Sequence, residues 1–163
     1  MTPSMQNLLK NLDQAMENGR ILKDGNSATV VLIDTPAGRL VVKRYNLKNS
    51  WHRLARAFQS SRASISWANI LRLEFLGIRT APAVALIEER IGPLRGRAYL
   101  VTEYVDALDA TSLADQGASD ETLQRMIGLL RNMNVAGLSH GDLKASNILL
   151  TIDGPMLIDL DSM

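Results

Sequence analysis

Two polar stretches decide how this chain is interpreted: HGDLKASN at residues 140–147 and LIDLD at residues 157–161. The first is predicted to be a loop between a helix and a β-hairpin, and it places Asp142, Lys144 and Asn147 within six positions. Asp159 follows Asn147 by twelve residues, at the end of a predicted strand. Asp and Asn also cap polar loops for reasons of turn geometry alone, and that is the alternative interpretation.

Phosphoryl transfer needs groups of these kinds. An Asp accepts or orients the proton of the attacking hydroxyl, while an Asn and a second Asp hold Mg²⁺ against the triphosphate. A cation offsets the charge that builds on the transferring group. The kinase template has the same order of Asp, Asn and metal-binding Asp, and here Asn147 follows Asp142 by five positions. The stretch therefore predicts a phosphotransferase.

The residues before this loop predict a fold of the α+β class. Apolar periodicity and turn residues indicate an N-terminal helix, three strands, a main helix and two more strands. The expected helices are 4–17 and 50–76, the second breaking near 60–61, and the expected strands are 21–23, 29–33, 40–45, 84–89 and 98–104. We expect these strands to form a five-stranded antiparallel sheet within residues 1–105.

Residues 106–163 are expected to hold the start of a helical lobe with the catalytic loop and a hairpin. A helix is predicted over 123–135, capped at its start by Ser119. Its predicted buried stripe consists of Leu123, Met126, Ile127, Leu130 and Met133. The hairpin strands are expected at 148–150 and 156–158. The predicted organisation is thus a sheet lobe at 1–105 and a partial helical lobe at 106–163.

Composition and charge narrow the class of protein. The 163 residues are 46% apolar and 21% charged, which is ordinary for a globular protein. The chain has no cysteine, so disulfides and thiolate metal sites are excluded. It shows neither a transmembrane run nor a signal peptide, and a cytoplasmic location is expected. Residues 35–73 contain no acidic residue, and this basic stretch predicts either an anionic ligand or a solvated face.

Several of these motifs together resemble the protein-kinase-like superfamily. The catalytic loop begins His-Gly-Asp where eukaryotic kinases have His-Arg-Asp, and the metal-binding strand ends Ile-Asp-Leu-Asp instead of Asp-Phe-Gly. Within the superfamily, further stretches resemble the lipopolysaccharide kinases that act on Kdo or heptose of the inner core. These stretches are VKRYN at 42–46, SRA at 61–63, Trp67 and LGIRTAP at 76–82. The resemblance runs from about Leu22 to the last residue and implies a protein-kinase-like fold.

The resemblance also implies a role for each matching residue. Asp142 is expected to be the catalytic base, with Lys144 near the γ-phosphate and His140 bracing the loop by hydrogen bonding. Asn147 and Asp159 are expected to bind Mg²⁺. Nucleotide binding is assigned to Lys43, which would reach the α- and β-phosphates of ATP, to the turn residues Gly25, Asn26 and Ser27, and to Glu103.

The sequence departs from the kinase pattern in two places. Kinases pair the strand lysine with a glutamate on the following helix, but the acidic residue on the predicted helix is Glu74, close to its end. The chain also stops at Met163, four residues past Asp159. We therefore expect either a fragment or a naturally short form of the fold.

The expected acceptor is an anionic sugar or glycolipid. Arg53, Arg56 and Arg62, with Trp51, are candidates for a surface that binds acidic glycolipid at the inner face of the inner membrane. Phe58 and Trp67 either belong to this surface or are core residues of the predicted helix, and the core is the favoured interpretation for these two. Nucleic acid is not an expected partner, because no recognition motif is present. Two other hypotheses stay open: a small-molecule kinase of the aminoglycoside or fructosamine type, and a non-catalytic, pseudokinase-like module that binds nucleotide.

Overall fold

The computed structural model describes residues 3–46, 60–91 and 94–163. These residues form two compact units. The first unit contains residues 1–64 and 83–104, and the second contains residues 65–82 and 105–163. The division of the sequence at residue 105 stays a prediction, and each unit is described below by itself.

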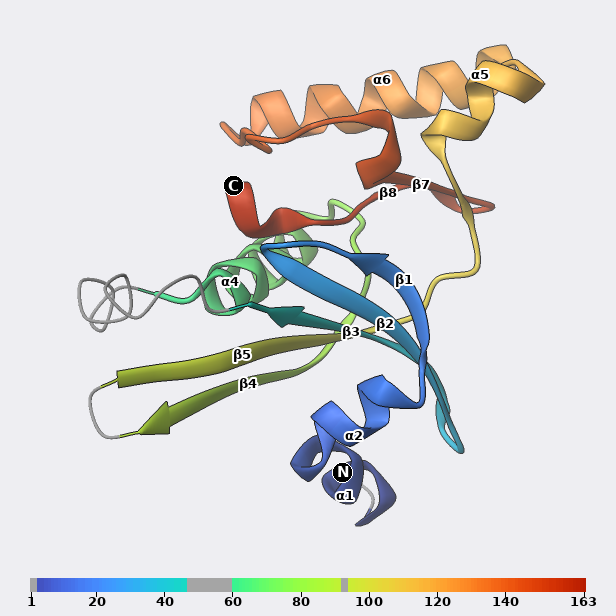
Figure 1. Cartoon of the computed structure of the whole chain (residues 1–163). Helices are drawn as coiled ribbons and strands as arrows, with labels where there is room; N and C mark the ends of the chain where they lie inside the picture. Colours follow the sequence, from blue (N-terminus) through green and yellow to red (C-terminus); the bar gives the residue numbers. More distant parts are fainter. Residues whose placement is uncertain (1–2, 47–59, 92–93) are drawn as a thin grey trace. The chain divides into compact units, whose positions relative to one another are not determined.

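The first unit is built on the predicted five-stranded antiparallel sheet, and its strands lie in the order β1-β2-β3-β5-β4 (Figure 1). Its strands are β1 (Arg20–Asp24), β2 (Ala28–Thr35), β3 (Gly38–Tyr45), β4 (Ala83–Ile91) and β5 (Leu94–Glu103). Strand β3 lies at the centre, between β2 and β5, and it carries Lys43. The sheet confirms the α+β class that was predicted from alternating apolar residues.

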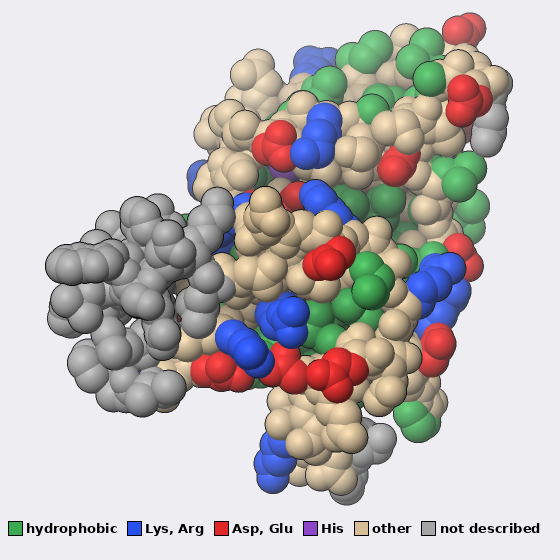
Figure 2. All heavy atoms as spheres, in the orientation of Figure 1, with side chains coloured by type: hydrophobic (Ala, Val, Ile, Leu, Met, Phe, Trp, Pro, Cys, Tyr) green, Lys and Arg blue, Asp and Glu red, His purple; other side chains and the backbone are tan. Residues whose placement is uncertain are grey.

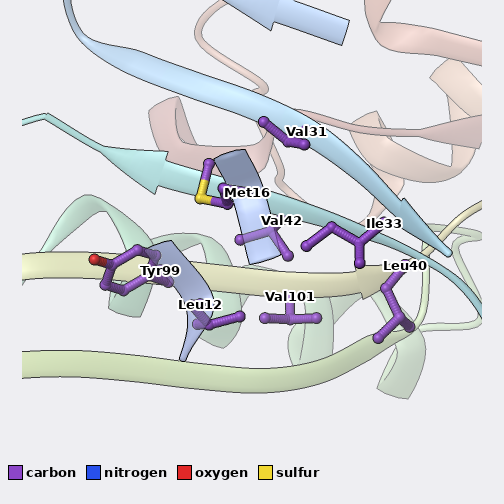
Figure 3. Packing of buried hydrophobic residues seen from close by; sticks show 8 residues of the cluster. All are labelled: Leu12, Met16, Val31, Ile33, Leu40, Val42, Tyr99 and Val101. Atoms are coloured by element: carbon purple, nitrogen blue, oxygen red, sulfur yellow. The ribbon is translucent and has the colours of Figure 1, made fainter. Parts of the chain in front are cut away.

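One face of this sheet packs against a pair of short N-terminal helices, α1 (Pro3–Lys10) and α2 (Leu12–Glu17). Leu12 and Met16 lie over apolar side chains that point from β2, β3 and β5 (Figure 3). The strand members of this core are Val31, Ile33, Leu40, Val42, Tyr99 and Val101. They share one face because successive side chains of a strand alternate, and Val42 is paired directly with Val31 and Val101.

The sequence predicted one helix over 4–17, and the structure divides it at Asn11. The backbone of Asn11 leaves the helical region at φ −123° and ψ 40°. Its side-chain Nδ2 donates to the Asn7 carbonyl at 3.2 Å. Asn side chains compete in this way for backbone groups, which is why they are poor helix formers. The break lets α2 place Leu12 and Met16 into the core.

A polar cluster joins α2 to the sheet beside this apolar core. Asp13 accepts hydrogen bonds from Arg44 Nη1 at 3.1 Å and from the Tyr99 hydroxyl at 3.0 Å, and it also pairs with Arg97. Figure 2 shows acidic and basic side chains lying beside one another above the N-terminal helices. We call Asp13, Arg44, Arg97 and Tyr99 the α2 clasp.

The protonation of the clasp is fixed by its own contacts. Burial by itself would raise the pKa of Asp13, but hydrogen bonds from Arg44 and Tyr99 and the charge of Arg97 outweigh burial and lower the pKa. Burial and the hydrogen bond to Asp13 raise the pKa of Tyr99 to about 12. The carboxylate is therefore charged and the phenol neutral over a wide pH range.

The second unit combines helices with a three-stranded sheet in the order β6-β7-β8. Its helices are α4 (Arg62–Phe75, whose first three residues belong to the first unit), α5 (Leu113–Gln116) and α6 (Asp120–Val135). Its strands are β6 (Leu108–Asp109), β7 (Ile148–Thr151) and β8 (Gly154–Leu157), with 3₁₀ turns η1 (Ala110–Ser112), η2 (Ala145–Asn147) and η3 (Leu160–Ser162). The predicted hairpin at 148–158 is confirmed, and the expected helical residues 50–59 lie outside the described residues.

The predicted buried stripe of α6 is wrong for three of its members. Leu123, Ile127 and Leu130 are 44%, 56% and 41% exposed, whereas Leu129 and Met133 are buried. The helix is apolar on more than one face, so its period alone does not select the face that packs on β8. The predicted N-cap is confirmed, because Ser119 Oγ accepts from the Thr122 N–H at 3.2 Å.

No helix among the described residues combines the length and the apolar character that crossing a bilayer requires.

Candidate catalytic loop and nucleotide-binding strand

The catalytic loop lies between α6 and β7 and presents two charged side chains to solvent. Lys144 Nζ donates to Asp142 Oδ2 at 2.7 Å, with both side chains about half exposed. The hydrogen bond from Lys144 lowers the pKa of Asp142. Asp142 is therefore ionised at neutral pH and already paired with a cation.

Asn147 is buried behind this pair and organises the loop. Its Nδ2 donates to the Asp142 carbonyl at 2.9 Å, and its own carbonyl accepts from the Ile158 N–H at 3.0 Å. The second bond ties the catalytic loop to the residue directly before Asp159. Since Nδ2 is used as a donor, the amide oxygen of Asn147 is the atom left to contact a cation.

His140 braces the same turn from the other side, in agreement with the prediction. The side chain is 2% exposed, and its Nε2 lies 3.0 Å from the Ile158 carbonyl. Because a carbonyl only accepts, Nε2 carries the proton of this bond. Both backbone groups of Ile158 are therefore held by the loop that contains Asp142 and Asn147.

Asp159 has a strained backbone conformation. It has φ 63° and ψ 53°, and it is the one residue other than glycine with positive φ among the described residues. Gly141 also has positive φ, at 69°, and a Cβ added there would collide with the Ser162 carbonyl. Such conformations persist where the surroundings over-determine them, and they are concentrated at functional sites.

In the first unit, Lys43 lies on the face of the sheet opposite the N-terminal helices. It pairs with Val30 on β2 and Leu100 on β5, and it alternates with the core residue Val42. Its Nζ lies 4.8 Å from the centroid of the Tyr45 ring, and the guanidinium of Arg62 lies 5.5 Å from the same ring. The buried aromatic ring thus holds two cations on this side of the sheet.

The predicted phosphate-covering turn is a tight β1–β2 connection. Gly25 N–H donates to the Ala28 carbonyl at 3.1 Å, so that N–H is already used by the hairpin. Asn26 is exposed and Ser27 half-buried. Asn46, directly after β3, donates through Nδ2 to the Gly25 carbonyl at 3.0 Å and through its N–H to the Ser27 carbonyl at 3.1 Å. The turn is therefore fixed to the strand that carries Lys43.

The other nucleotide-binding candidate, Glu103, ends β5 and is exposed. Glu74 is exposed on α4. Trp51, Arg53, Arg56 and Phe58 lie outside the described residues. Among those that are described, no group of three or more His, Cys, Asp or Glu side chains could hold a metal ion.

Comparison with known families identifies this arrangement. The model of the lipopolysaccharide kinase (Kdo/WaaP) family matches residues 15–162. The chain belongs to this lipopolysaccharide kinase family. The predicted kinase family and enzyme class are thereby confirmed, and a kinase family implies the use of ATP.

Solved structures agree on the fold of this lipopolysaccharide kinase family member. A structure of WaaP in complex with acyl carrier protein is 18% identical with a TM-score of 0.64, covering 99% of this chain and 70% of that one. The kinase domain of PknI from Mycobacterium tuberculosis is 21% identical with a TM-score of 0.50, covering 88% of this chain and 58% of that one. No curated protein sequence matched this chain. At these identities the structural likeness shows the protein-kinase-like fold alone.

Two residues of this kinase-family chain carry contacts that the sequence did not reveal. Asn46 fixes the β1–β2 turn, and Asn69 on α4 donates through Nδ2 to the Leu160 carbonyl at 2.8 Å. Asn69 sits in the same helical stripe as the buried Ser66 and Leu73, and a polar residue within such a stripe was the available signal. Neither partner could be predicted, since both are backbone groups remote in sequence.

Proposed function

We propose that this chain is an ATP-dependent phosphotransferase that moves the γ-phosphate to a sugar hydroxyl of the lipopolysaccharide inner core, on Kdo or heptose. The observation that carries the proposal lies within the second unit. The Asp142–Lys144 pair and the Asp159 turn are tied together through Asn147 and His140. Membership of the lipopolysaccharide kinase family supplies the acceptor class.

Asp142 takes the role of the base that orients the acceptor hydroxyl and receives its proton. Its lowered pKa keeps the carboxylate ionised at neutral pH, so it accepts a hydrogen bond before it accepts a proton. Lys144, 2.7 Å away, offsets negative charge on the transferring phosphoryl group once the hydroxyl displaces it from Asp142. Both side chains are half exposed, which leaves room for a sugar.

The donor set at the Asp159 turn fits Mg²⁺. The Asn147 amide oxygen and the Asp159 carboxylate are hard oxygen ligands, and the Asn147–Ile158 backbone bond brings the two residues together. Magnesium is commonly held by one or two carboxylates together with substrate phosphates, not by a cage of protein ligands. Bound there, Mg²⁺ would neutralise charge on the phosphate oxygens of ATP.

Lys43 is proposed to contact the α- and β-phosphates, and Gly25, Asn26, Ser27 and Glu103 to complete the nucleotide contacts. The support for Lys43 is its central strand and the Tyr45 ring, which orients the ammonium. Asn46 supports the turn residues by holding their backbone against the end of β3.

For the acceptor side, we propose an anionic glycolipid and a peripheral contact with the inner membrane surface, with nucleic acid not expected. The support is the run of 39 residues, 35–73, that lacks acidic side chains. Arg62 is a described and exposed member of it. Basic side chains near the headgroups attract acidic lipids.

A nucleotide-binding module without transfer activity is the second candidate. The Asp142–Lys144 ion pair favours it, because the carboxylate that would receive the proton is already neutralised. An aminoglycoside- or fructosamine-type kinase uses the same loop and is separated from the main proposal by its acceptor.

The first test is a thermal melt of the 163-residue chain with and without Mg-ATP, beside Asp159→Ala. Ligand at about 100 times its Kd stabilises the native state by roughly 2.7 kcal/mol. We expect a Mg²⁺-dependent rise in melting temperature in the wild type and none in Asp159→Ala. No rise in a cooperatively melting wild type would refute nucleotide binding by this chain.

The second test is transfer to Kdo- and heptose-bearing core acceptors, with an aminoglycoside and a fructosamine as competitors. Asp142→Ala should abolish turnover while the Mg-ATP melting shift persists. Turnover that survives in Asp142→Ala would overturn the role given to this residue. A melting shift without transfer to any acceptor would favour the non-catalytic module.

A further inference from the structure

Asn69 makes a contact across the second unit that the proposed catalytic groups do not account for. It is half-buried on α4, and its Nδ2 lies 2.8 Å from the Leu160 carbonyl and 3.5 Å from the Met163 carbonyl. These acceptors belong to the segment directly after Asp159. Asn69, which lies 90 positions before Asp159 in the chain, therefore hydrogen-bonds to the backbone next to the Asp159 turn.

The contact from Asn69 falls on the side of the turn that follows Asp159. On the preceding side, the N–H of Ile158 donates to Asn147 and its carbonyl lies 3.0 Å from His140. On the following side, the Leu160 carbonyl is held by Asn69. Asp159 lies between these anchors with positive φ. A left-handed Asp is maintained by its surroundings, and these two anchors belong to the surroundings of Asp159.

The residues around Asn69 give this contact a rigid base. Ser66, Ile70 and Leu73 on the same helix are buried, at 2%, 3% and 0% exposure, and Leu160 itself is 1% exposed. A hydrogen bond in such surroundings is sheltered from water and directional. The Asn69 amide group therefore links α4 to the segment that follows Asp159.

We infer that Asn69 is a positioning residue: it holds the left-handed Asp159 turn in register with α4 and thereby sets the carboxylate for Mg²⁺. The inference rests on the proposed function, in which Asp159 is a metal ligand. In this inference, the neutral amide of Asn69 links α4 to the Asp159 turn.

The chemistry of the amide gives discriminating variants. Asn69→Ala removes the hydrogen-bond donor. Asn69→Asp keeps the shape of the side chain but places a carboxylate against the Leu160 carbonyl oxygen. Asn69→Gln keeps the donor on a longer side chain. Arg72→Gln is the matched control, because Arg72 is exposed on the same helix. Should Asn69→Ala fail to fold, Asn69→Asp carries the same comparison.

The first readout is amide hydrogen exchange in the ligand-free full chain, followed by NMR. We expect Asn69→Ala to accelerate exchange at residues 158–162 at least about tenfold relative to the rest of the second unit, with Arg72→Gln unchanged and Asn69→Gln in between. Exchange at 158–162 that matches wild type, or that rises equally throughout the unit, would overturn the inference.

The second readout is the Mg²⁺ concentration that gives half of the maximal ATP-dependent melting shift. It should rise several-fold in Asn69→Ala and return toward wild type in Asn69→Gln. A loosened turn with an unchanged Mg²⁺ requirement would overturn the positioning role. If the wild type shows no response to Mg-ATP, the proposed function fails on that result, and exchange at the turn still decides whether Asn69 holds it.

Discussion

Residue by residue, the candidate site is a set of side chains whose backbone contacts matter as much as their functional groups. Asn147 is both a proposed ligand and the brace of Asp142, and His140 contacts the Ile158 carbonyl. Asp142 itself is exposed, and its ionisation is set by Lys144. Of these contacts, the one that sets the ionisation of Asp142 comes from a side chain, Lys144, that can be removed by substitution.

Removal of Lys144 should change the titration of Asp142. In the wild type the pKa of Asp142 should lie below its ordinary value of 3.8, because Lys144 donates a hydrogen bond to the carboxylate. Lys144→Ala should raise that pKa toward the ordinary value, which carbon-detected NMR of the Asp carboxyls would show. Lys10→Ala, an exposed lysine in the first unit, is the control and should leave the titration unchanged.

Because the pKa of Asp142 is lowered, its ionisation should be insensitive to mild acid. A carboxylate with a lowered folded-state pKa stays ionised until the pH falls below about 3.8. We therefore expect Asp142 to stay ionised between pH 5 and pH 8. An Asp142 pKa at or above the ordinary value in the wild type would contradict the hydrogen bond from Lys144.

At the scale of elements, the α2 clasp connects an N-terminal helix to the two central strands. Arg44 comes from β3 and Tyr99 and Arg97 from β5, so one carboxylate on α2 bridges neighbouring strands. Arg44 is the residue next to Lys43 and points to the opposite face. The clasp therefore fixes the strand that presents the proposed phosphate-binding lysine.

The clasp predicts a loss of stability in alkali. The folded-state pKa of Tyr99 is about 12 and its ordinary value is 10.0. The neutral Tyr99 phenol contributes to the free energy of unfolding, and this contribution is complete below pH 10. It is lost as the pH rises toward 12, because the phenol of the unfolded state releases its proton at a lower pH than that of the folded state. Urea unfolding should show a decline of about 2 kcal/mol over this interval.

Tyr99→Phe should flatten that alkaline decline, although it lowers stability at neutral pH by removing the bond to Asp13. Tyr104→Phe, which leaves the clasp in place, should retain the decline. Equal slopes above pH 10 in the wild type and Tyr99→Phe would show that the phenol does not hold the clasp.

For the molecule as a whole, the sequence predicted the strands better than the helices. Alternation in 40–45 fixes which side of β3 faces the core, because a strand has two faces. Helix α6, in contrast, has apolar residues on more than one face, so its sequence does not show which face is buried. In the structure Leu129 is buried and Leu130 is exposed. The break at Asn11 depends on a single side-chain bond that no periodicity encodes.

The candidate site divides in the same way. The offsets among Asp142, Asn147 and Asp159 were visible in the sequence, because the loop and hairpin that carry them are local. The left-handed backbone of Asp159 and its contact with Asn69 were not, since they depend on residues distant in the chain. Sequence patterns indicate which groups are candidates for the chemistry, while tertiary contacts determine how firmly these groups are held.

The division into two compact units predicts that each can be destabilised separately. Val42→Ala removes a fully buried side chain from the first unit, and Leu157→Ala does so in the second. Each should cost about 2–4 kcal/mol through the lost contacts and the cavity left behind. Hydrogen exchange should accelerate mainly in the unit that carries the substitution. Uniform acceleration of both units by either variant would show that they unfold as one.

Gly141 gives the catalytic motif a constraint of a different kind. Its positive φ and the Ser162 carbonyl beside it exclude any side chain at the middle position of His-Gly-Asp, as long as the backbone at 162 keeps its course. An arginine there, as in eukaryotic kinases, would require the chain beyond Asp159 to take another route. We therefore expect the two positions to diverge together during evolution: a lineage that acquires the arginine should also differ in the course of the segment that follows Asp159.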